Sequence, residues 1–600
     1  MTESWRLAAG DHFLKDADIG LLRLYTLVNS QIFRLFPDIT LLGFRRLQYG
    51  FTIAALLVFS IALFRVEKKA WFLGYVFSIF AFTGLDPVGS TSNLNYYTYP
   101  HFFLILYISF FLFGITANSP VSKKVFYLLS GFCLWCISIC LLHLSVIIVA
   151  PLLLFFLLKR IKPDQLVFPF RDVLLVMSPF CICWLVFLSY FNVAYIKALF
   201  KTVIFFRSIP FYSDSGLITI NPGIVSHVLV AGAILVLIRL SLHLYRFHWI
   251  YGFSCLVFIS ILSYLIMETS FFGILRPCWI DSYRRPGWFA SYLAAFYLIV
   301  GLGWGIRIFH GKFPSEKLPF VLIVLPCMVL SLSMVVFSGL GMLTLMHCAI
   351  PAMAAVTLFL THHQFFKTKS IAIQIFSIII CFGPFYYEIG WSDWRHTYFD
   401  VSPEKMDTVI KQGFGAGIKT NSVYSSIYGW VESRTNEFSN PDDFMISTVL
   451  NPMAHMIAKR RPALVDSFLN PGSPAFSRAH QSWVERMIRD KREPVLAFVF
   501  ENTPAFSAQS LSGTGHSFFQ GLFAYPQYDS NDYIIDYITK NMEPLETIRI
   551  SRRYKMIFFI NPNKVPANKR KKAIAWLHQM ARKTPDSAAY RQMAAKLMNP

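Results

Sequence analysis

The stretch FRRLQYGFTIAALLVFSIALFRVEKK, residues 44–69, decides the class of fold. Its middle part, residues 49–65, has no charged side chain before Arg65. As a helix, that part is long enough to cross most of the ~30 Å hydrocarbon core of a bilayer. Basic residues stand on both sides of it, as they do around many membrane spans. The pattern therefore predicts a transmembrane helix over 49–65.

The composition of the whole chain agrees with a membrane protein. The 600 residues are 55% hydrophobic and 17% aromatic, and the mean hydropathy is +0.49. This is too apolar for a soluble protein of the same length. In a membrane protein, a net charge of +22 is first a clue to topology, because basic residues concentrate in cytoplasmic loops. We predict no nucleic-acid partner from it. The ten Cys lie between Cys133 and Cys381 and suggest no disulfide framework.

Similar apolar runs recur along the first two thirds of the chain. The pair 125–141 and 144–158 is short and meets at LLHLS, so one broken element is the alternative there. We predict a polytopic α-helical membrane domain over 49–388 with about 12 transmembrane helices. The predicted spans are 49–65, 71–86, 100–117, 125–141, 144–158, 172–194, 223–244, 248–270, 287–309, 318–337, 341–361 and 370–388.

The basic residues of the loops predict the orientation of these spans. Sixteen Lys and Arg fall in one set of loops, and only six fall in the other. The first set is expected on the cytoplasmic side. Residues 1–48 and everything after 388 are then external, which means periplasmic in the inner membrane of a Gram-negative bacterium. The six external cations are Lys197, Lys201, Arg207, Arg276, Arg284 and Arg285.

The opening segment, residues 1–48, is thus expected outside with no span before it. Three explanations stand: a first transmembrane helix upstream of Met1 is missing, the segment crosses as an N-out tail, or the span count is off by one. We favour the first. Within the segment, DIGLLRLYTLVNSQIFRLFP, residues 18–37, places apolar side chains on one helical face. That pattern predicts an amphipathic helix lying in the membrane interface.

The chain changes character after residue 388. Three strand patterns appear in FMISTVL, PVLAFVF and YKMIFFI, with helices expected near 403–412, 452–460, 478–490 and 528–541. We predict an external α/β domain over 389–565. A basic helical tail follows over 566–600, where NKRKK is either a contact for anionic lipid headgroups or a solvated helix start.

The external, membrane-proximal segments hold the candidate site residues. Arg276, Arg284 and Arg285, with Lys201, stand on the side that otherwise avoids cations. Arg side chains bind phosphate through bidentate, charge-assisted hydrogen bonds, so these residues predict a donor-phosphate site. Ordinary interfacial anchoring is the alternative. A second loop, GLDPVGSTSNLNYYTYPH, offers Asp86, Tyr96 and Tyr97 to a sugar. The opening segment offers possible general bases, which are Glu3, Asp11 and Asp16.

Four stretches carry a resemblance to a known family. They are ESWRLAAGDHFLKDADIGLLRLYTLVNSQIFRLFP, FRRLQYGFTIAALLVFSIALFRVEKK, NLNYYTYPHFFLILYISFFLFG and DDFMISTVLNPMAHMIAKRRPALVDSFLNPG. Together they resemble the GT-C glycosyltransferases, in particular the bacterial group of protein mannosyltransferases and aminoarabinose transferases. The resemblance covers nearly the whole chain, but its motifs are loose.

The resemblance implies a membrane glycosyltransferase that moves a sugar from a polyprenyl-phosphate donor to an external lipid, polysaccharide or protein acceptor. In that family a carboxylate in the first external loop acts as general base or metal ligand, so a divalent metal ion is the one cofactor left open. This chain shows neither the first helix nor a clear acidic pair. The key carboxylate is therefore expected upstream of Met1. The alternatives are a flippase or transporter of an amphiphile, and an inactive truncated family member.

Overall fold

The computed structural model describes residues 2–12, 16, 23–66, 98–140, 142–160, 169–207, 322–323, 325–330, 333, 406–447, 454–465, 474–502, 533–549, 554–584 and 587–598. The chain divides into two compact units. One, here called the flanking unit, joins Met1–Phe44, Lys197–Ile209 and Phe399–Pro600. The other, here called the apolar unit, joins Arg45–Ile196 and Pro210–Tyr398. Helices α3 and α8 each pass from one unit to the other.

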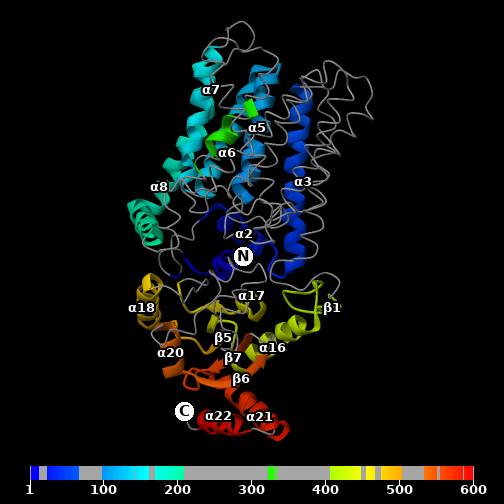
Figure 1. Ribbon diagram of the computed structural model, residues 1–600, viewed down its shortest axis with the longest axis vertical. Helices are drawn as coiled ribbons and strands as arrows, with labels where there is room; N and C mark the ends of the chain where they lie inside the picture. The colour runs from blue at the N-terminus through cyan, green and yellow to red at the C-terminus, as the bar shows by residue number, and fades with distance from the viewer. Residues whose placement is uncertain are drawn as a thin grey trace, which may run out of the picture. The chain divides into compact units, whose positions relative to one another are not determined.

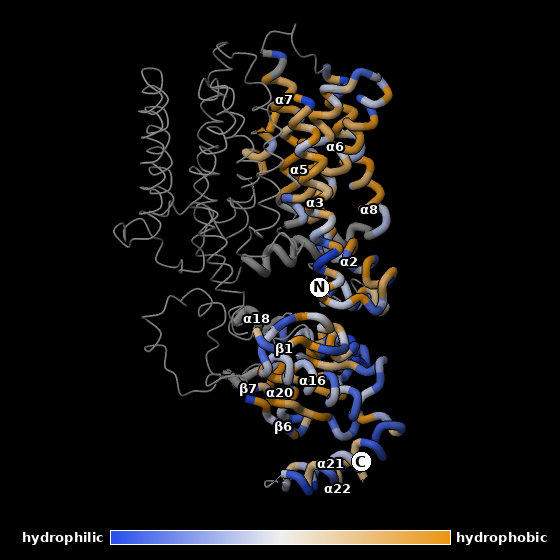
Figure 2. Tube along the Cα trace, turned by 90° about the vertical axis from the view of Figure 1, so that its right-hand side faces the viewer, coloured by the Kyte–Doolittle hydropathy of each residue, from blue (hydrophilic) through white to orange (hydrophobic). Residues whose placement is uncertain are grey.

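The described part of the apolar unit is a set of long helices. Hydrophobic residues cover most of α5, α6 and α7 (Figure 2). Four described helices are long and apolar enough to cross a membrane, those containing Leu41–Val66, Tyr99–Thr116, Pro120–Cys140 and Phe170–Tyr190. The elements are α3 (Leu41–Val66), α5 (Thr98–Thr116), α6 (Pro120–Cys140), the 3₁₀ helix η3 (Leu142–Ile148), α7 (Val149–Arg160) and α8 (Phe170–Arg207).

The predicted spans that fall on described residues coincide with helices. The runs 49–65, 100–117 and 172–194 lie in α3, α5 and α8, although α3 begins at Leu41 and α8 continues to Arg207. The two short predicted spans, 125–141 and 144–158, are interrupted at LLHLS, where η3 separates α6 from α7. The predicted span 71–86 and those after 222 lie outside the described residues, apart from isolated positions within 318–337. A count of twelve therefore stays a prediction.

Helices α6 and α8 run parallel. Lys123 Nζ lies 2.7 Å from Asp172 Oδ2 near the start of each helix. Further along, Trp184 Nε1 donates a 2.9 Å hydrogen bond to Ser138 Oγ. Between these contacts the helices approach so closely that a Cβ added at Gly131 would overlap the Val176 carbonyl oxygen. Parallel helices begin on the same side of a membrane, which agrees with the prediction of one outward and one return crossing over 125–158.

Helices α3 and α5 also end on one side, because the Arg65 guanidinium carbon lies 4.9 Å from the centre of the Phe113 ring. Residues 117–119 connect α5 directly to α6. The ends of α3 and α5 and the starts of α6 and α8 thus share one side. That side carries Arg65, Lys123, Lys124 and Arg171, which favours the cytoplasmic assignment.

The flanking unit is built around a five-stranded mixed sheet with strand order β4-β3-β5-β7-β6 (Figure 1). Strand β3 pairs in parallel with β4 and β5, whereas β7 pairs antiparallel with β5 and β6. The strands are β3 (Phe444–Ser447), β4 (Arg461–Pro462), β5 (Leu496–Asn502), β6 (Glu543–Arg549) and β7 (Tyr554–Ile560), and a separate pair is β1 (Thr408–Val409) with β2 (Lys419–Thr420). The helices are α16 (Ser422–Phe438), α17 (Ala454–Ala458), α18 (Pro474–Arg489), α20 (Tyr533–Asn541), α21 (Ala567–Lys583) and α22 (Ala588–Met598).

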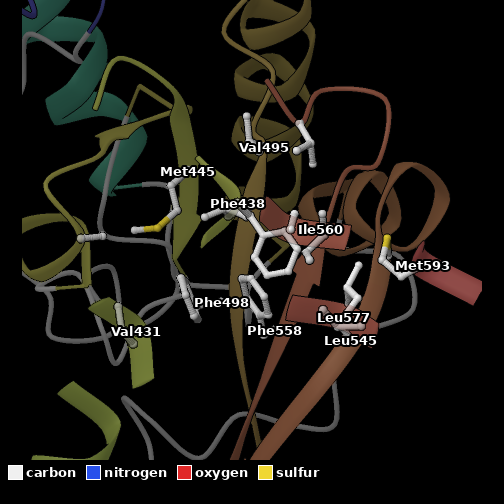
Figure 3. Packing of buried hydrophobic residues seen from close by; sticks show 14 of the residues in the cluster. Val431, Phe438, Met445, Val495, Phe498, Leu545, Phe558, Ile560, Leu577 and Met593 are labelled. Carbon is white, nitrogen blue, oxygen red and sulfur yellow. The ribbon is translucent and has the colours of Figure 1, made fainter. Parts of the chain in front are cut away.

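Both faces of the sheet are covered. Phe558 belongs to a core shared with α16, α21 and α22, in which Phe438 and Leu577 are fully buried (Figure 3). Its neighbour Phe559 belongs to the core on the other face, with helices α18 and α20. Successive side chains of a strand point to opposite faces, so a strand covered on both sides is apolar throughout. This explains why YKMIFFI contains so few polar residues.

The predicted strands of the α/β domain are confirmed as β3, β5 and β7, while β6 and α16 were not predicted. The helix expected near 403–412 is wrong over its described residues, since Thr408–Val409 form a strand. The basic segment 566–600 forms α21 and α22, whose Leu577 and Met593 pack in the same core as the sheet. These two helices are therefore a layer of the α/β domain.

Candidate functional site

The predicted catalytic carboxylates lie in the opening segment, which begins with α1 (Thr2–Ala8). Gly10 ends this helix with a φ of +101°. The Asp11 N–H then bonds to the Arg6 carbonyl at 3.0 Å, and the Gly10 N–H bonds to the Leu7 carbonyl at 3.3 Å. This is the Schellman arrangement, and glycine adopts its left-handed residue at no steric cost. The turn brings the Asp11 side chain back against Arg6.

Arg6 is the centre of a buried ion cluster, and its side chain is fully buried. Its Nε donates to Asp11 Oδ2 at 2.8 Å, and its Nη1 donates to Glu3 Oε2 at 3.2 Å. The remaining bonds go to backbone carbonyls of Val465 at 2.9 Å, Leu464 at 3.0 Å and Asp16 at 2.8 Å. These five contacts use every N–H that a guanidinium offers. Two of them reach residues more than 450 positions along the chain.

Arg492 is the second cation of this cluster and comes from the turn before β5. Its Nη1 donates to Asp16 Oδ1 at 2.6 Å, and its Nη2 lies 3.1 Å from Asp11 Oδ2. The same Nη2 donates to the Pro462 carbonyl at 2.9 Å. Arg461 Nη1 adds a longer contact of 3.5 Å to Asp11 Oδ1. The cluster thus holds three guanidinium groups and three carboxylates.

These contacts indicate what the carboxylates do. Both oxygens of Asp11 face guanidinium donors, and its side chain has no exposed surface. A general base needs a lone pair that reaches the substrate proton. This geometry therefore favours a structural role for Asp11, in which it binds Arg6 and Arg492. Asp16 keeps 16% of its side chain exposed, yet it also accepts bonds from Arg492 and from the His12 N–H. The catalytic assignment of Glu3, Asp11 and Asp16 stays a prediction.

The resemblance left a divalent metal ion open without naming its ligands, and the described carboxylates of the opening segment can be tested for that role. Their oxygens are turned toward Arg6 and Arg492, and a cation in their midst would meet two guanidinium groups. This arrangement does not fit a metal ion. Among the described residues, no group of three or more His, Cys, Asp or Glu is placed to hold one.

The buried imidazole of His455 lies beside this ion cluster. Its Nδ1 is 3.3 Å from the Arg460 carbonyl oxygen. Burial, and then the positive charge of Arg6, lower the pKa of His455 to about 3. The ring is therefore neutral at physiological pH, and it adds no further positive charge to the cluster.

A second polar network, separate from the predicted site, surrounds Glu546 on β6. Its carboxylate accepts hydrogen bonds from Arg434 Nε at 2.5 Å, Trp430 Nε1 at 2.9 Å and the Tyr590 hydroxyl at 2.9 Å. Burial, followed by the charge of Glu546, raises the pKa of Tyr590 to about 12. The network ties α16 and α22 to the sheet edge and leaves the carboxylate well supplied with donors.

The structure brings together some of the predicted residues. Glu3, Asp11 and Asp16 meet in one cluster, and Lys201 lies on the last turns of α8 within the flanking unit. The cations Arg6, Arg461 and Arg492 were missed. Arg6 stands one helical turn after Glu3, which is a readable ion-pair spacing, but nothing local marks the other two. The other predicted site residues lie outside the described part of the chain. They are Asp86, Tyr96, Tyr97, Arg276, Arg284 and Arg285.

Comparisons with known proteins give only distant similarities. No protein-family model matches the chain, and no curated protein matches it. Among solved structures, it is similar to the oligosaccharyltransferase AglB from Archaeoglobus fulgidus in complex with an inhibitory peptide and a dolichol-phosphate. The TM-score is 0.40 at 10% identity, over 83% of this chain and 64% of that one.

Two further structures of the Archaeoglobus fulgidus oligosaccharyltransferase are similar to the same degree. The complex with Zn and sulfate has a TM-score of 0.37 at 9% identity, over 83% of this chain and 62% of that one. The form tethered to an acceptor peptide with the NVT sequon has a TM-score of 0.38 at 9% identity, over 83% and 64%. The chain thus spans less than two thirds of each neighbour. TM-scores this low do not establish a shared fold, so membership of the GT-C class stays a prediction.

Proposed function

We propose that this protein is a membrane glycosyltransferase of the GT-C type, which transfers a sugar from a polyprenyl-phosphate donor to an acceptor on the outer side of the cytoplasmic membrane. The sequence resemblance is the origin of this proposal. It implies a first external loop and a C-terminal domain on the same face of the membrane.

One observation carries the proposal, and it is the buried ion cluster between the two ends of the chain. Arg6 donates to the carbonyls of Leu464 and Val465, and Arg492 binds Asp11 and Asp16. The opening segment and the α/β domain belong to one compact unit, which supports the proposal that both lie on the same side of the membrane. A transporter has no general need to lock its flanks together, whereas a transferase gains a fixed external surface beside its membrane-embedded donor.

The roles of the individual residues follow from the same proposal. Arg276, Arg284 and Arg285, with Lys201, bind the donor phosphate, since guanidinium groups pair with phosphate in a planar, bidentate fashion. Asp86, Tyr96 and Tyr97 line the path of the sugar. A carboxylate activates the acceptor hydroxyl for attack on the anomeric carbon, and the basic residues stabilise the departing lipid phosphate. Asp16 remains the best placed of the three described candidates, because part of its side chain reaches solvent.

The test uses the full chain in nanodiscs and a photoreactive polyprenyl-phosphate analogue. We expect saturable crosslinking that unlabelled polyprenyl phosphate displaces. The variants Arg284→Ala and Arg285→Ala should bind about 10- to 150-fold more weakly, the range expected for a lost charge-assisted hydrogen bond of about 1.5–3 kcal/mol. Lys replacements should recover only part of the loss, because a point charge lacks the planar fork.

A matched control is Lys124→Ala, which removes a cation from the opposite, predicted cytoplasmic side. It should bind like the parent. If the parent shows no saturable binding, the donor assignment is wrong. If it binds the analogue but moves a fluorescent lipid across proteoliposomes without any sugar transfer, the flippase alternative replaces the transferase.

A further inference from the structure

Helix α21 (Ala567–Lys583) has two contrasting faces. Ala573 and Leu577 on one face are fully buried in the core of the α/β domain. The opposite face is exposed and cationic. No Asp or Glu occurs between residues 564 and 583. We call this face the basic stripe, and its exposed members are Lys571, Lys572, His578, Arg582 and Lys583.

Only part of this positive charge serves the fold. Lys564 pairs with Glu493 at 2.5 Å, and Lys569 donates to the Asn436 carbonyl at 2.8 Å. Lys572 lies 3.5 Å from Glu437. Within the described part of the chain, the side chains of Lys571, Arg582 and Lys583 are exposed and make no hydrogen bond or ion pair. Their charge is therefore available to a partner.

The placement of the cations also works against the helix itself. The first turns of α21 contain Lys569, Arg570, Lys571 and Lys572 and no acidic residue. The N-terminal end of a helix carries a partial positive charge, which disfavours cations there. The N-cap residue is Pro566, which provides no side-chain hydrogen bond to offset this. A helix selected only for stability would carry acidic residues at these positions.

The basic stripe lies far from the part of the flanking unit that leads into the membrane. The opening segment meets the sheet at its β4 edge through Arg461 and Asp11. Helix α22, which packs on α21, is tied to the opposite edge strand β6 through Tyr590 and Glu546. Four strand spacings separate these edges, about 19 Å. Figure 1 shows α21 and α22 beyond β6, at the far end of this unit from α2. Within the flanking unit, the helix that carries the stripe is thus separate from the contacts that hold the opening segment.

We propose that the basic stripe is a docking surface for an anionic polysaccharide, that is, an extended glycan bearing several carboxylate or phosphate groups. Lys571 and Arg582 are eleven residues apart, which is about 17 Å along a helix. A single small anion fills only a fraction of that length, whereas a chain with repeated charges contacts all of it. The predicted external location of this unit favours a glycan over a nucleic acid. The inference rests on the proposed function, for which it names the class of acceptor.

The experiment measures binding of the full chain, in nanodiscs of neutral lipid, to immobilised polyuronate. Neutral dextran is the reference polymer. The test variant carries Lys571→Glu, Arg582→Glu and Lys583→Glu. We expect at least a 10-fold loss of polyuronate affinity and a shallower salt dependence, because polyion binding releases counterions for each contact made. The matched control carries Lys411→Glu, Lys419→Glu and Lys491→Glu, which change the net charge equally, and it should lose less than 2-fold.

Other outcomes overturn the inference. Equal loss in both triple variants would mean that only net charge matters. Tighter binding of single-stranded DNA or of anionic vesicles than of polyuronate would replace the glycan by another partner. Crosslinking of the polyprenyl-phosphate analogue is measured in parallel. The stripe variant should retain this crosslinking. If the parent binds polyuronate but does not bind the lipid phosphate, the proposed transferase is refuted and the docking surface is still supported.

Discussion

Replacing Arg492 by Met should release the opening segment from the α/β domain. In the parent, the Arg492 guanidinium binds both Asp11 and Asp16 and donates to the Pro462 carbonyl. Met keeps much of the volume of the side chain and removes its charge. Removing one partner of a buried ion pair typically costs about 3–5 kcal/mol. Arg6 and Arg461 still accompany Asp11, so we expect the lower end, about 3 kcal/mol.

The assay reports how often the opening segment detaches. Ser4 is fully buried in α1, and Ser4→Cys changes little in size. In a cysteine-free background, the rate at which a thiol reagent modifies this position follows the population of opened molecules. A cost of about 3 kcal/mol raises that population roughly 100-fold, since each 1.4 kcal/mol is a factor of ten. The control is Arg489→Met, three residues earlier, whose side chain is 72% exposed.

An unchanged modification rate in Arg492→Met would refute this reasoning, because the ion cluster would then contribute nothing to docking. The double variant Arg492→Met with Asp11→Asn gives a sharper check. Without Arg492 the Asp11 charge is poorly compensated, so neutralising it should recover part of the loss. Residues in contact typically couple by about 0.5–3 kcal/mol. If the two single effects simply add, Asp11 and Arg492 do not act as a pair.

Three further predictions concern other parts of the chain. Gly131→Leu should lower the thermal stability of the purified protein by about 1–3 kcal/mol through overpacking between α6 and α8, whereas Gly50→Leu, where an added Cβ meets nothing within 4 Å, should not. The buried His455 has its pKa lowered from 6.5 to about 3, so the unfolded state binds the extra proton and stability falls as the pH drops from 6.5 towards 3. His455→Asn should flatten that slope, measured by urea unfolding, by about 1.4 kcal/mol per pH unit, and an equal slope in both proteins would exclude this titration. Cysteines introduced at Ala9 and Ser119, both exposed, should react with an impermeant reagent from opposite sides of the membrane, and labelling from one side would contradict the topology.

The membrane helices were predictable because an apolar run of membrane length has few other solutions. Their ends were not. Helix α3 begins eight residues before the run 49–65, at Leu41, where the Leu41 N–H bonds to the Phe414 carbonyl at 2.7 Å. Hydropathy reports where the lipid-facing part stops, while the backbone hydrogen bonds of the helix continue into the flanking unit.

In the α/β domain, the missed elements are those with weak patterns. Strand β6 buries only Leu545 among its residues and contains Pro544. Both features suit an edge strand, which is half solvated and tolerates proline. Helix α16 is rich in Ser and Tyr, yet Ile427, Val431 and Phe438 recur at helical spacing and are buried. That periodicity was present in the sequence, but its low mean hydropathy concealed it.

The candidate site was half predictable. Three carboxylates in a short external segment attract attention, so Glu3, Asp11 and Asp16 were selected. Their partners cannot be paired with them from the sequence, since Arg492 follows Asp11 by 481 positions. Without those partners the carboxylates resemble free acids available for catalysis. The fold converts at least Asp11 into a fixed anion, because it supplies guanidinium groups on several sides.

The flanking unit also restricts the topology of the whole chain. Residues up to Phe44, the end of α8 from Lys197 and the chain from Phe399 belong to one folded body, so they share one side of the membrane. Each intervening segment must then cross the bilayer an even number of times. Six predicted spans lie between 44 and 197, and six lie between 209 and 399, so both numbers satisfy the condition. A count that is wrong by a single span fails this condition. The cations at the ends of α3 and α5 and at the starts of α6 and α8 then favour the outside for the flanking unit, where the ion cluster, the basic stripe and the proposed acceptor would meet the same aqueous phase.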